Sequence, residues 1–266
     1  MRAASSVAVL LVGAAVIVGA AEPKGLVPFS EQPWDRIVGP GRVSQLAARA
    51  RALLFSVPER ADEWGYLRRS SSRDDDIVVD STAPFSAPNV LRIVFTPDMR
   101  NDHEPSVHWI GLPSVKEVYA TWWIKLSPNW TSSPAGGGKM TFLHVAGGHG
   151  QVYTGLFGSA APHRVSVNTE WAPYGQKIWD PNRETTPIMY DRWYRIDWHV
   201  KWESAPGTGD ATIAWRVNGR LNGEYTDVKL PEGAPAFQQF EFAPTLQNPP
   251  RAEQYMYIDH TSIAVR

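Results

Sequence analysis

The feature that most constrains the fold is a pair of strongly alternating segments between residues 190 and 223. In residues 194–202, aromatic and aliphatic side chains alternate with Arg, Asp, His and Lys, and residues 213–217 continue the pattern. A period of two indicates strands with one apolar and one polar face. Asn218-Gly219 ends the second run and is typical of a tight hairpin turn. Two long antiparallel strands with an aromatic face require a second sheet to cover that face.

The rest of the chain has short strand patterns separated by turn residues. We expect further strands at residues 77–80, 90–95, 107–110, 118–126, 139–146, 152–157, 164–170, 237–243 and 255–265. Clusters of Pro, Gly, Asn and Ser separate these segments, and the sequence has no internal repeat of fixed period. The pattern predicts an all-β fold, a two-sheet antiparallel jelly-roll sandwich, which a chain of 266 residues accommodates as one domain.

The N-terminal region has a different character. Residues 1–21 have the pattern of a secretory signal peptide: Arg2, an uncharged apolar run over residues 7–20 that is too short for a membrane span, and small residues at its end. An uncleaved anchor is the alternative. Residues 22–76 are expected to form an extended lead-in and one helix, from Val43 to Pro58, packed on a jelly roll of residues 77–266. We therefore expect a secreted or periplasmic protein without stable membrane insertion after signal cleavage.

Composition excludes several classes of function. With 26 Lys and Arg against 27 Asp and Glu, the chain has no electrostatic basis for binding nucleic acid. The absence of cysteine excludes disulfides and thiolate metal sites. His103 and His108 are five residues apart, and Pro105 would break the helix that a zinc protease needs to present them. We expect no cofactor and no metal site.

Six segments together carry a family resemblance. They are Ser86–Arg92, Glu117–Trp130, Gly138–His144, Arg192–Asp197, Ala214–Gly219 and Tyr257–Thr261. With them, residues 77–266 resemble the concanavalin A-like jelly rolls, most closely secreted bacterial proteins of the polysaccharide-lyase type, which are relatives of heparin and alginate lyases. The resemblance implies a protein that binds a polysaccharide or oligosaccharide and cleaves an acidic polysaccharide by β-elimination.

A uronate lyase requires a base, an acid and a group that stabilises charge on the sugar carboxylate. The resemblance implies His144 as the base or a charge stabiliser, Arg92 as the carboxylate neutraliser, Tyr153 as the acid and Asn168 as a positioning group. The sequence departs from the family pattern, because the Gln before His144 is absent and the late strand, residues 240–248, contains no tyrosine. Tyr255 is the alternative source of the hydroxyl group.

Three further residues are expected to bind the sugar: Trp123, Glu170 and Trp171. Trp122 and Trp123 point to opposite faces of one strand, so one of them belongs to the core and the other is free to stack on a sugar. A non-catalytic glycan-binding, lectin-like module is the second hypothesis. A glycoside hydrolase ranks below both, because a local pair of carboxylates is missing and a pair such as Glu170 with Glu241 would come from separate strands.

Overall fold

The computed structural model describes residues 35–38, 67–69, 75–84, 89–102, 104–132, 137–148, 150–171, 175–230 and 236–265. All of these residues belong to one compact unit, residues 33–266. The expected signal peptide and the expected helix at residues 43–58 lie outside the described residues. No helix in the described part of the chain is long and apolar enough to cross a membrane.

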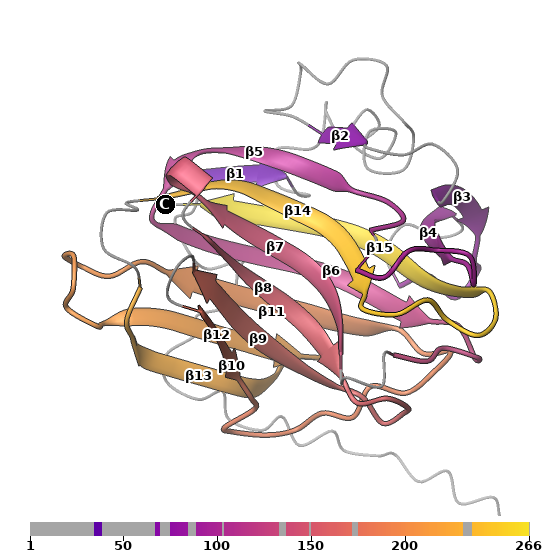
Figure 1. Ribbon diagram of the computed structural model, residues 1–266. Helices are drawn as coiled ribbons and strands as arrows, with labels where there is room; N and C mark the ends of the chain where they lie inside the picture. Colours follow the sequence, from indigo (N-terminus) through magenta and orange to yellow (C-terminus); the bar gives the residue numbers. More distant parts are fainter. Residues whose placement is uncertain are drawn as a thin grey trace, which may run out of the picture. The chain divides into compact units, whose positions relative to one another are not determined.

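The described strands form two antiparallel sheets, which confirms the expected all-β sandwich (Figure 1). Sheet A has the order β13 (Arg220–Val228), β12 (Ala211–Val217), β11 (Tyr194–Lys201), β6 (Glu117–Leu126), β15 (Gln254–Val265), β4 (Asn89–Phe95) and β3 (Asp75–Val79), with β1 (Asp35–Val38) also paired to β15. Sheet B has the order β10 (Gly175–Trp179), β9 (Arg164–Trp171), β8 (Gly150–Phe157), β7 (Gly137–Val145), β14 (Phe237–Leu246), β5 (His108–Val115) and β2 (Leu67–Arg69).

The Asn-Gly turn predicted from the sequence is present between β12 and β13. Asn218 and Gly219 have φ values of 51° and 79°, the left-handed conformation that a two-residue hairpin turn of type I′ requires. The Asn218 side-chain oxygen also accepts a hydrogen bond of 2.8 Å from the backbone N–H of Arg195. The turn is therefore attached to β11 as well as to the hairpin it closes.

Aromatic side chains from both sheets form the core between them. Trp122 of β6 contacts Phe240 of β14 with ring centroids 6.2 Å apart, and Trp202, just after β11, contacts Phe237 at 5.1 Å. The buried indole N–H of Trp215 donates a hydrogen bond of 3.1 Å to the carbonyl of Val165 in the opposite sheet. The alternating run that begins at Tyr194 therefore buries its apolar face against sheet B, as the period of two predicted.

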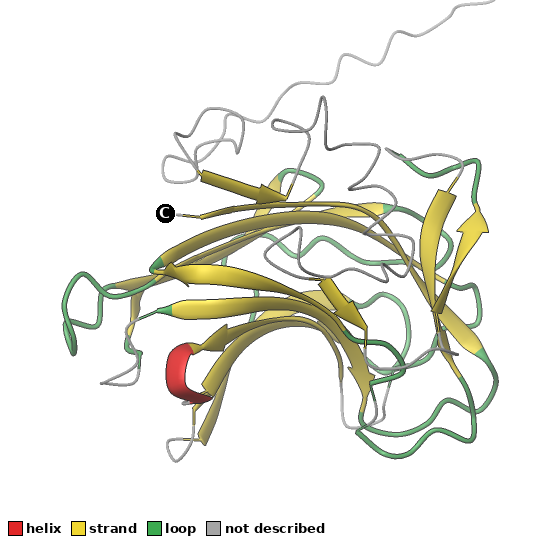
Figure 2. Ribbon diagram, turned by 90° about the horizontal axis from the view of Figure 1, so that it is seen from above, coloured by secondary structure: helices red, strands yellow, loops and turns green. Residues whose placement is uncertain are grey.

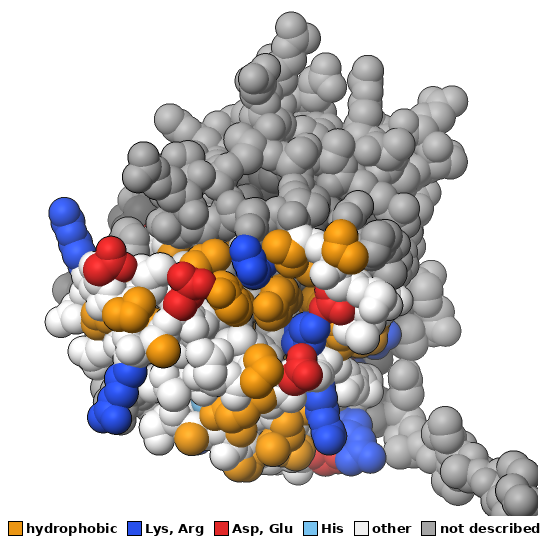
Figure 3. All heavy atoms as spheres, turned by 90° about the vertical axis from the view of Figure 1, so that its right-hand side faces the viewer, with side chains coloured by type: hydrophobic (Ala, Val, Ile, Leu, Met, Phe, Trp, Pro, Cys, Tyr) orange, Lys and Arg blue, Asp and Glu red, His pale blue; other side chains and the backbone are white. Residues whose placement is uncertain are grey.

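Sheet B is strongly arched, and this curvature makes its outward face concave. Figure 2 shows the arched strands, with the short 3-10 turn at Ala146–Gly148 marking the end of β7 and the hollow side turned away from sheet A. Figure 3 shows the side of the molecule that lies at the right in Figure 1, where basic and acidic side chains are interspersed among hydrophobic ones. The hollow of sheet B is therefore the feature of the fold that is shaped to receive a ligand.

Candidate functional site

Strand register brings two rows of side chains together on the outward face of sheet B. One row contains Gln239, His144, Gln151, Glu170 and Gln176. The next row contains Glu241, Phe142, Tyr153, Asn168 and Ile178. Residues directly opposite each other in antiparallel strands share one face of the sheet, so five strands contribute side chains to a single surface.

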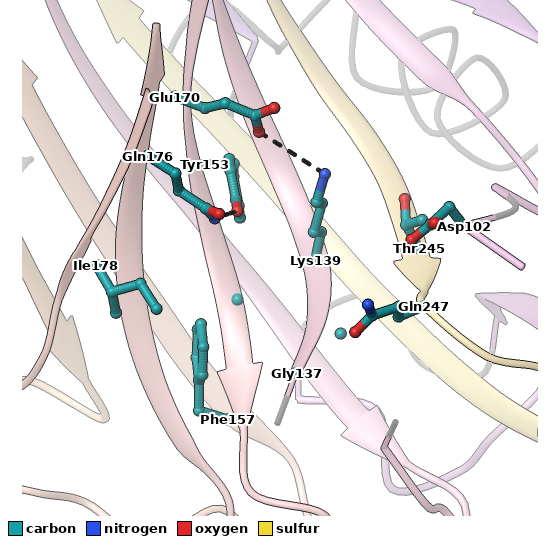
Figure 4. Close-up of a pocket in the computed structure, with 12 residues that line it drawn as sticks. Asp102, Gly137, Lys139, Tyr153, Phe157, Glu170, Gln176, Ile178, Thr245 and Gln247 are labelled. Carbon is teal, nitrogen blue, oxygen red and sulfur yellow. Dashed lines mark hydrogen bonds and ion pairs between the residues drawn. The ribbon is translucent and has the colours of Figure 1, made fainter. Parts of the chain in front are cut away.

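A groove with a volume of about 300 Å³ lies on this face and crosses the strands. Figure 4 shows it from the open side. Its lining consists of Asp102, Gly137, Gly138, Lys139, Tyr153, Gly155, Phe157, Glu170, Gln176, Ile178, Thr245 and Gln247. The volume is at the lower end of the range for small-molecule sites.

Tyr153 lies at the centre of the site and is almost completely buried. Its hydroxyl oxygen accepts a hydrogen bond from the side-chain amide of Gln176 (Figure 4), and its ring packs 5.4 Å from that of Phe142. Burial, reinforced by the negative charge of Glu170, raises the pKa of Tyr153 to about 12, although the Gln176 hydrogen bond acts in the opposite direction. The phenol therefore stays protonated well above neutral pH.

Lys139 provides the positive charge of the site. Its ammonium nitrogen lies 5.0 Å from the centroid of the Tyr153 ring and 3.8 Å from a carboxylate oxygen of Glu170. Glu170 also accepts a hydrogen bond of 3.1 Å from the amide of Gln151. Among the described residues that line the groove, Lys139 is the one cationic side chain. Because it is 37 % exposed, it is accessible to an anionic ligand.

His144 forms a pair with a carboxylate on the neighbouring strand. Its Nε2 atom lies 2.7 Å from Oε2 of Glu241, whose other oxygen accepts a hydrogen bond from the Gln239 amide. The imidazole ring is stacked on Phe142 at a centroid distance of 5.8 Å. In a neutral imidazole one ring nitrogen is a donor and the other an acceptor. His144 therefore pairs with a carboxylate, and this arrangement suits a general base.

Asn168 is the least satisfied polar side chain of the site. It is completely buried, and within the described residues neither its amide oxygen nor its amide nitrogen has a hydrogen-bond partner. It lies opposite Tyr153 on one side and Ile178 on the other. Buried polar groups without partners are uncommon in folded proteins and are often found at functional sites. Asn168 therefore lies under the concave face with its amide unpaired, and it is not one of the residues that line the groove.

The structure does not bring the other expected residues to this face. Arg92 is on β4 of sheet A, with its guanidinium group 4.8 Å from the centroid of the Tyr255 ring. Trp123 is on β6 of the same sheet, opposite Arg195. Trp171 lies in the core between the sheets, with its ring 6.3 Å from that of Trp202. Of the expected site residues, Tyr153, His144, Asn168 and Glu170 share the concave face of sheet B.

Sequence reasoning missed Lys139 because of a β-bulge. Strict alternation back from His144 places residue 140 on the outward face and Lys139 in the core. A register shift between Lys139 and Thr141 reverses the phase, so Met140 is buried and Lys139 lines the groove. Gln176 was also missed, because no strand was expected at residues 175–179, where the structure has β10. The described residues contain no group of three His, Cys, Asp or Glu placed to hold a metal ion.

No protein-family model and no curated protein matches the sequence. Similar folds occur among solved structures. The endo-β-1,4-glucuronan lyase of the fungus Trichoderma reesei is 13 % identical, with a TM-score of 0.54 over 77 % of this chain and 92 % of that one. An alginate lyase from a Chlorella virus is 13 % identical, with a TM-score of 0.53 over 76 % and 94 %.

A third similar structure is a double variant of an alginate lyase in complex with alginate trisaccharide. It is 10 % identical, with a TM-score of 0.51 over 66 % of this chain and 82 % of that chain. At these identities the similarity concerns the fold. It confirms the jelly-roll fold that the six sequence segments indicated, a fold that this chain shares with solved polysaccharide lyases.

Proposed function

We propose that this chain is a polysaccharide lyase that cleaves a uronate-containing polysaccharide by β-elimination on the concave face of sheet B. The observation that carries the proposal is the arrangement of Tyr153, a phenol held in its protonated form, next to the ammonium group of Lys139 in an open groove. The fold shared with alginate and glucuronan lyases supports the same chemistry by analogy.

The groups required for elimination are assigned as follows. A base removes the proton from C5 of the uronate, the C4–O4 bond breaks, a C4=C5 double bond forms, and the departing oxygen takes up a proton. His144 is the base and Tyr153 is the acid. They are diagonal neighbours on adjacent strands, a relationship that separates backbones by roughly 7–8 Å. A sugar ring lying between them would meet both.

Lys139 takes the role that the sequence assigned to Arg92. As the proton leaves C5, negative charge accumulates on the sugar carboxylate, and a nearby cation stabilises it. Arg92 lies on the other sheet, whereas Lys139 lies beside the tyrosine. Asn168 and Gln176 are assigned to positioning, since Gln176 holds the phenol and Asn168 has a free amide beneath it.

Glycoside hydrolysis is less compatible with this geometry. Glu170 and Glu241 do share the concave face, but they are on β9 and β14, which are three strands apart in the sheet. With strands about 4.8 Å apart this is roughly 14 Å, whereas paired catalytic carboxylates are about 5–9.5 Å apart. Both carboxylates also have polar partners, Lys139 and Gln151 for Glu170 and His144 for Glu241. A hydrolase is therefore not proposed.

The test is absorbance near 235 nm, where the double bond formed by elimination absorbs, during incubation with glucuronan, alginate, hyaluronan and heparin. We expect a rise with at least one polymer and a loss of about 100-fold or more in Tyr153→Phe, the range for removing a general acid. Lys139→Ala is expected to lose activity and Arg92→Ala to retain it, with folding of each variant checked by circular dichroism.

Two outcomes would contradict the proposal. A flat trace across the panel, combined with retained binding of one polymer in a pull-down, would identify a lectin-like glycan-binding module. Activity that survives Lys139→Ala and disappears in Arg92→Ala would move the site to sheet A.

A further inference from the structure

The groove continues from Tyr153 over a floor made of backbone. Gly137 and Gly138 of β7 and Gly155 of β8 line it. None of the three has the positive φ that would require glycine for conformational reasons. Glycine inside a strand is otherwise unfavourable and often marks a place where another group approaches the backbone closely.

A side chain at any of these positions would meet close neighbours. A Cβ atom on Gly155 would lie 3.0 Å from the Phe157 ring and 3.3 Å from the carbonyl oxygen of Gly138. A Cβ atom on Gly138 would lie 3.1 Å from Leu246, and one on Gly137 would lie 3.2 Å from the carbonyl oxygen of Leu156. Leu246 belongs to the core, so a side chain on Gly138 would enter the core, whereas Gly137 and Gly155 face the groove and keep its floor flat.

The two sides of this floor differ in chemistry (Figure 4). On one side lies the ring of Phe157, supported by the guanidinium group of Arg164 at 5.4 Å from the ring centroid. On the other side lie Thr245, Gln247 and Asp102, which offer hydroxyl, amide and carboxylate groups. A flat floor between an aromatic ring and hydrogen-bonding groups matches the shape and polarity of a sugar ring.

The charge of the groove limits which sugars can lie there. Among the described lining residues, Lys139 is the one cation, while Asp102 and Glu170 are carboxylates. Lys139 also lies 3.8 Å from Glu170, so a ligand carboxylate would share this one cation with Glu170. A second uronate on the glycine floor would face Asp102, and like charges at close range are unfavourable. Arg164, behind Phe157, is already paired with Asp180 at 3.0 Å.

We propose, on the basis of the proposed lyase function, that the groove binds one uronate unit beside Lys139 and an uncharged sugar on the glycine floor beside Asp102. The substrate is then a mixed polysaccharide in which uronate units adjoin neutral units. A chain made entirely of uronate places one carboxylate against Asp102. Phe157 and Asp102 are the specificity-determining residues of this neutral subsite.

The test uses polymers that share one backbone. Oxidation of cellulose at C6 gives β-1,4-glucuronan when complete, and a mixed chain of glucose and glucuronate when stopped halfway. We expect kcat/KM at 235 nm, expressed per uronate unit, to be about tenfold higher on the half-oxidised chain, as for a difference of 1.4 kcal/mol. Equal or higher values on the fully oxidised chain would overturn the proposal.

Two variants test whether the preference for the half-oxidised chain arises at the neutral subsite. In Asp102→Asn, the ratio of kcat/KM between the half-oxidised and the fully oxidised chain is expected to fall by at least about threefold, because a repulsive charge has been removed. The matched control is Asp98→Asn, an exposed carboxylate outside the groove lining, which is expected to leave the ratio unchanged. An unchanged ratio in Asp102→Asn would contradict the role of Asp102.

A binding measurement separates this inference from the proposed function. Tyr153→Phe is titrated calorimetrically with soluble oligosaccharides from the same two polymers. If no polymer gives a signal at 235 nm, the lyase proposal fails, whereas tighter binding of the mixed oligosaccharides would still support the neutral subsite. Tighter binding of the all-uronate oligosaccharides would overturn the subsite whatever the activity.

Discussion

Asn168 is the residue at which stability and function oppose each other most clearly. Its buried amide has no hydrogen-bond partner among the described residues, and such a group costs roughly 1–3 kcal/mol of stability when water is excluded. Asn168→Leu, which keeps the branching of the side chain and removes both polar atoms, is expected to stabilise the fold by about 1 kcal/mol and to weaken lyase activity. Thermal unfolding and the 235 nm assay measure the two effects.

The control for this substitution is a buried polar pair in the same strands. The hydroxyl groups of Thr141 and Thr154 are 2.5 Å apart and completely buried. Thr154→Val would leave Thr141 without that partner, so it is expected to destabilise the fold by about 1–3 kcal/mol. If Asn168→Leu lowers the unfolding temperature as Thr154→Val does, Asn168 is a structural residue.

Tyr153 predicts a specific response to alkaline pH. Its pKa in the folded state is about 12, against an ordinary value of 10.0, so folding favours the neutral phenol. The resulting stabilisation is fully present below pH 10 and is lost as the pH rises from 10 toward 12. In Tyr153→Phe, this loss of stability between pH 10 and 12 should be absent. The tyrosinate absorbance of the variant near 295 nm should also lack a component that titrates near pH 12.

The same titration can also contradict the prediction for Tyr153. Tyr225 and Tyr255 also have raised pKa values, so the comparison is made by subtracting the variant curve from that of the parent protein. A difference curve centred near pH 10 would mean that burial does not raise the pKa of Tyr153, and the predicted loss of stability between pH 10 and 12 would then be absent.

At the residue scale, the sequence was informative about types of side chain and much less about their positions. Tyr153, Asn168 and Glu170 were identified from the sequence, and the structure places them on one face with His144. Arg92 could not be assigned to a sheet, because a strand with alternating side chains has the same sequence pattern in either sheet of a sandwich. Lys139 was hidden by a bulge that shifts the alternation by one residue.

At the scale of the element, the β12–β13 hairpin depends on one glycine. Gly223 lies directly opposite Trp215, and a Cβ atom there would lie 2.0 Å from the indole ring. The same indole donates its N–H to Val165 of sheet B. Gly223→Ala must therefore displace a side chain that joins the two sheets, and we expect a loss of about 3 kcal/mol or more in the free energy of unfolding.

Gly219→Ala is the matched comparison in the same hairpin. Gly219 has a φ of 79° and nothing within 4 Å of an added Cβ atom, so alanine there meets backbone strain without a clash and should cost about 1–2 kcal/mol. Urea denaturation of both variants measures the difference. A larger loss for Gly219→Ala would mean that turn conformation, and not indole packing, limits the stability of the hairpin.

The alternating run from Tyr194 was predictable, whereas two strands at the edges of the sheets, β10 and β13, were missed. The run from Tyr194 has a period of two because one face is in the core, and its boundaries follow the pattern closely. In β10 the residues before Trp179 are all exposed, because it is an edge strand paired on one side, and its residues therefore lack alternation. The same holds for β13, whose burial does not alternate.

At the scale of the whole jelly roll, curvature decides which face is functional. Both sheets alternate in the sequence, so the pattern predicts two outward faces and does not say which one is hollow. The structure shows sheet B arched, with its hollow side outward (Figure 2). The groove, the Tyr153–Lys139 pair and the glycine floor all lie on that side. Arg92 and Trp123 are on the other sheet and therefore do not belong to this site.

The central claim is that this concave face binds the polysaccharide, and a crystal structure of Tyr153→Phe with a glucuronate-containing tetrasaccharide tests it most directly. The account predicts sugar units lying across β7 and β8 above Gly155, with one carboxylate within about 4 Å of the Lys139 ammonium, an ion-pair distance. A tetrasaccharide bound on the outward face of sheet A, beside Arg92 and Trp123, would contradict the account.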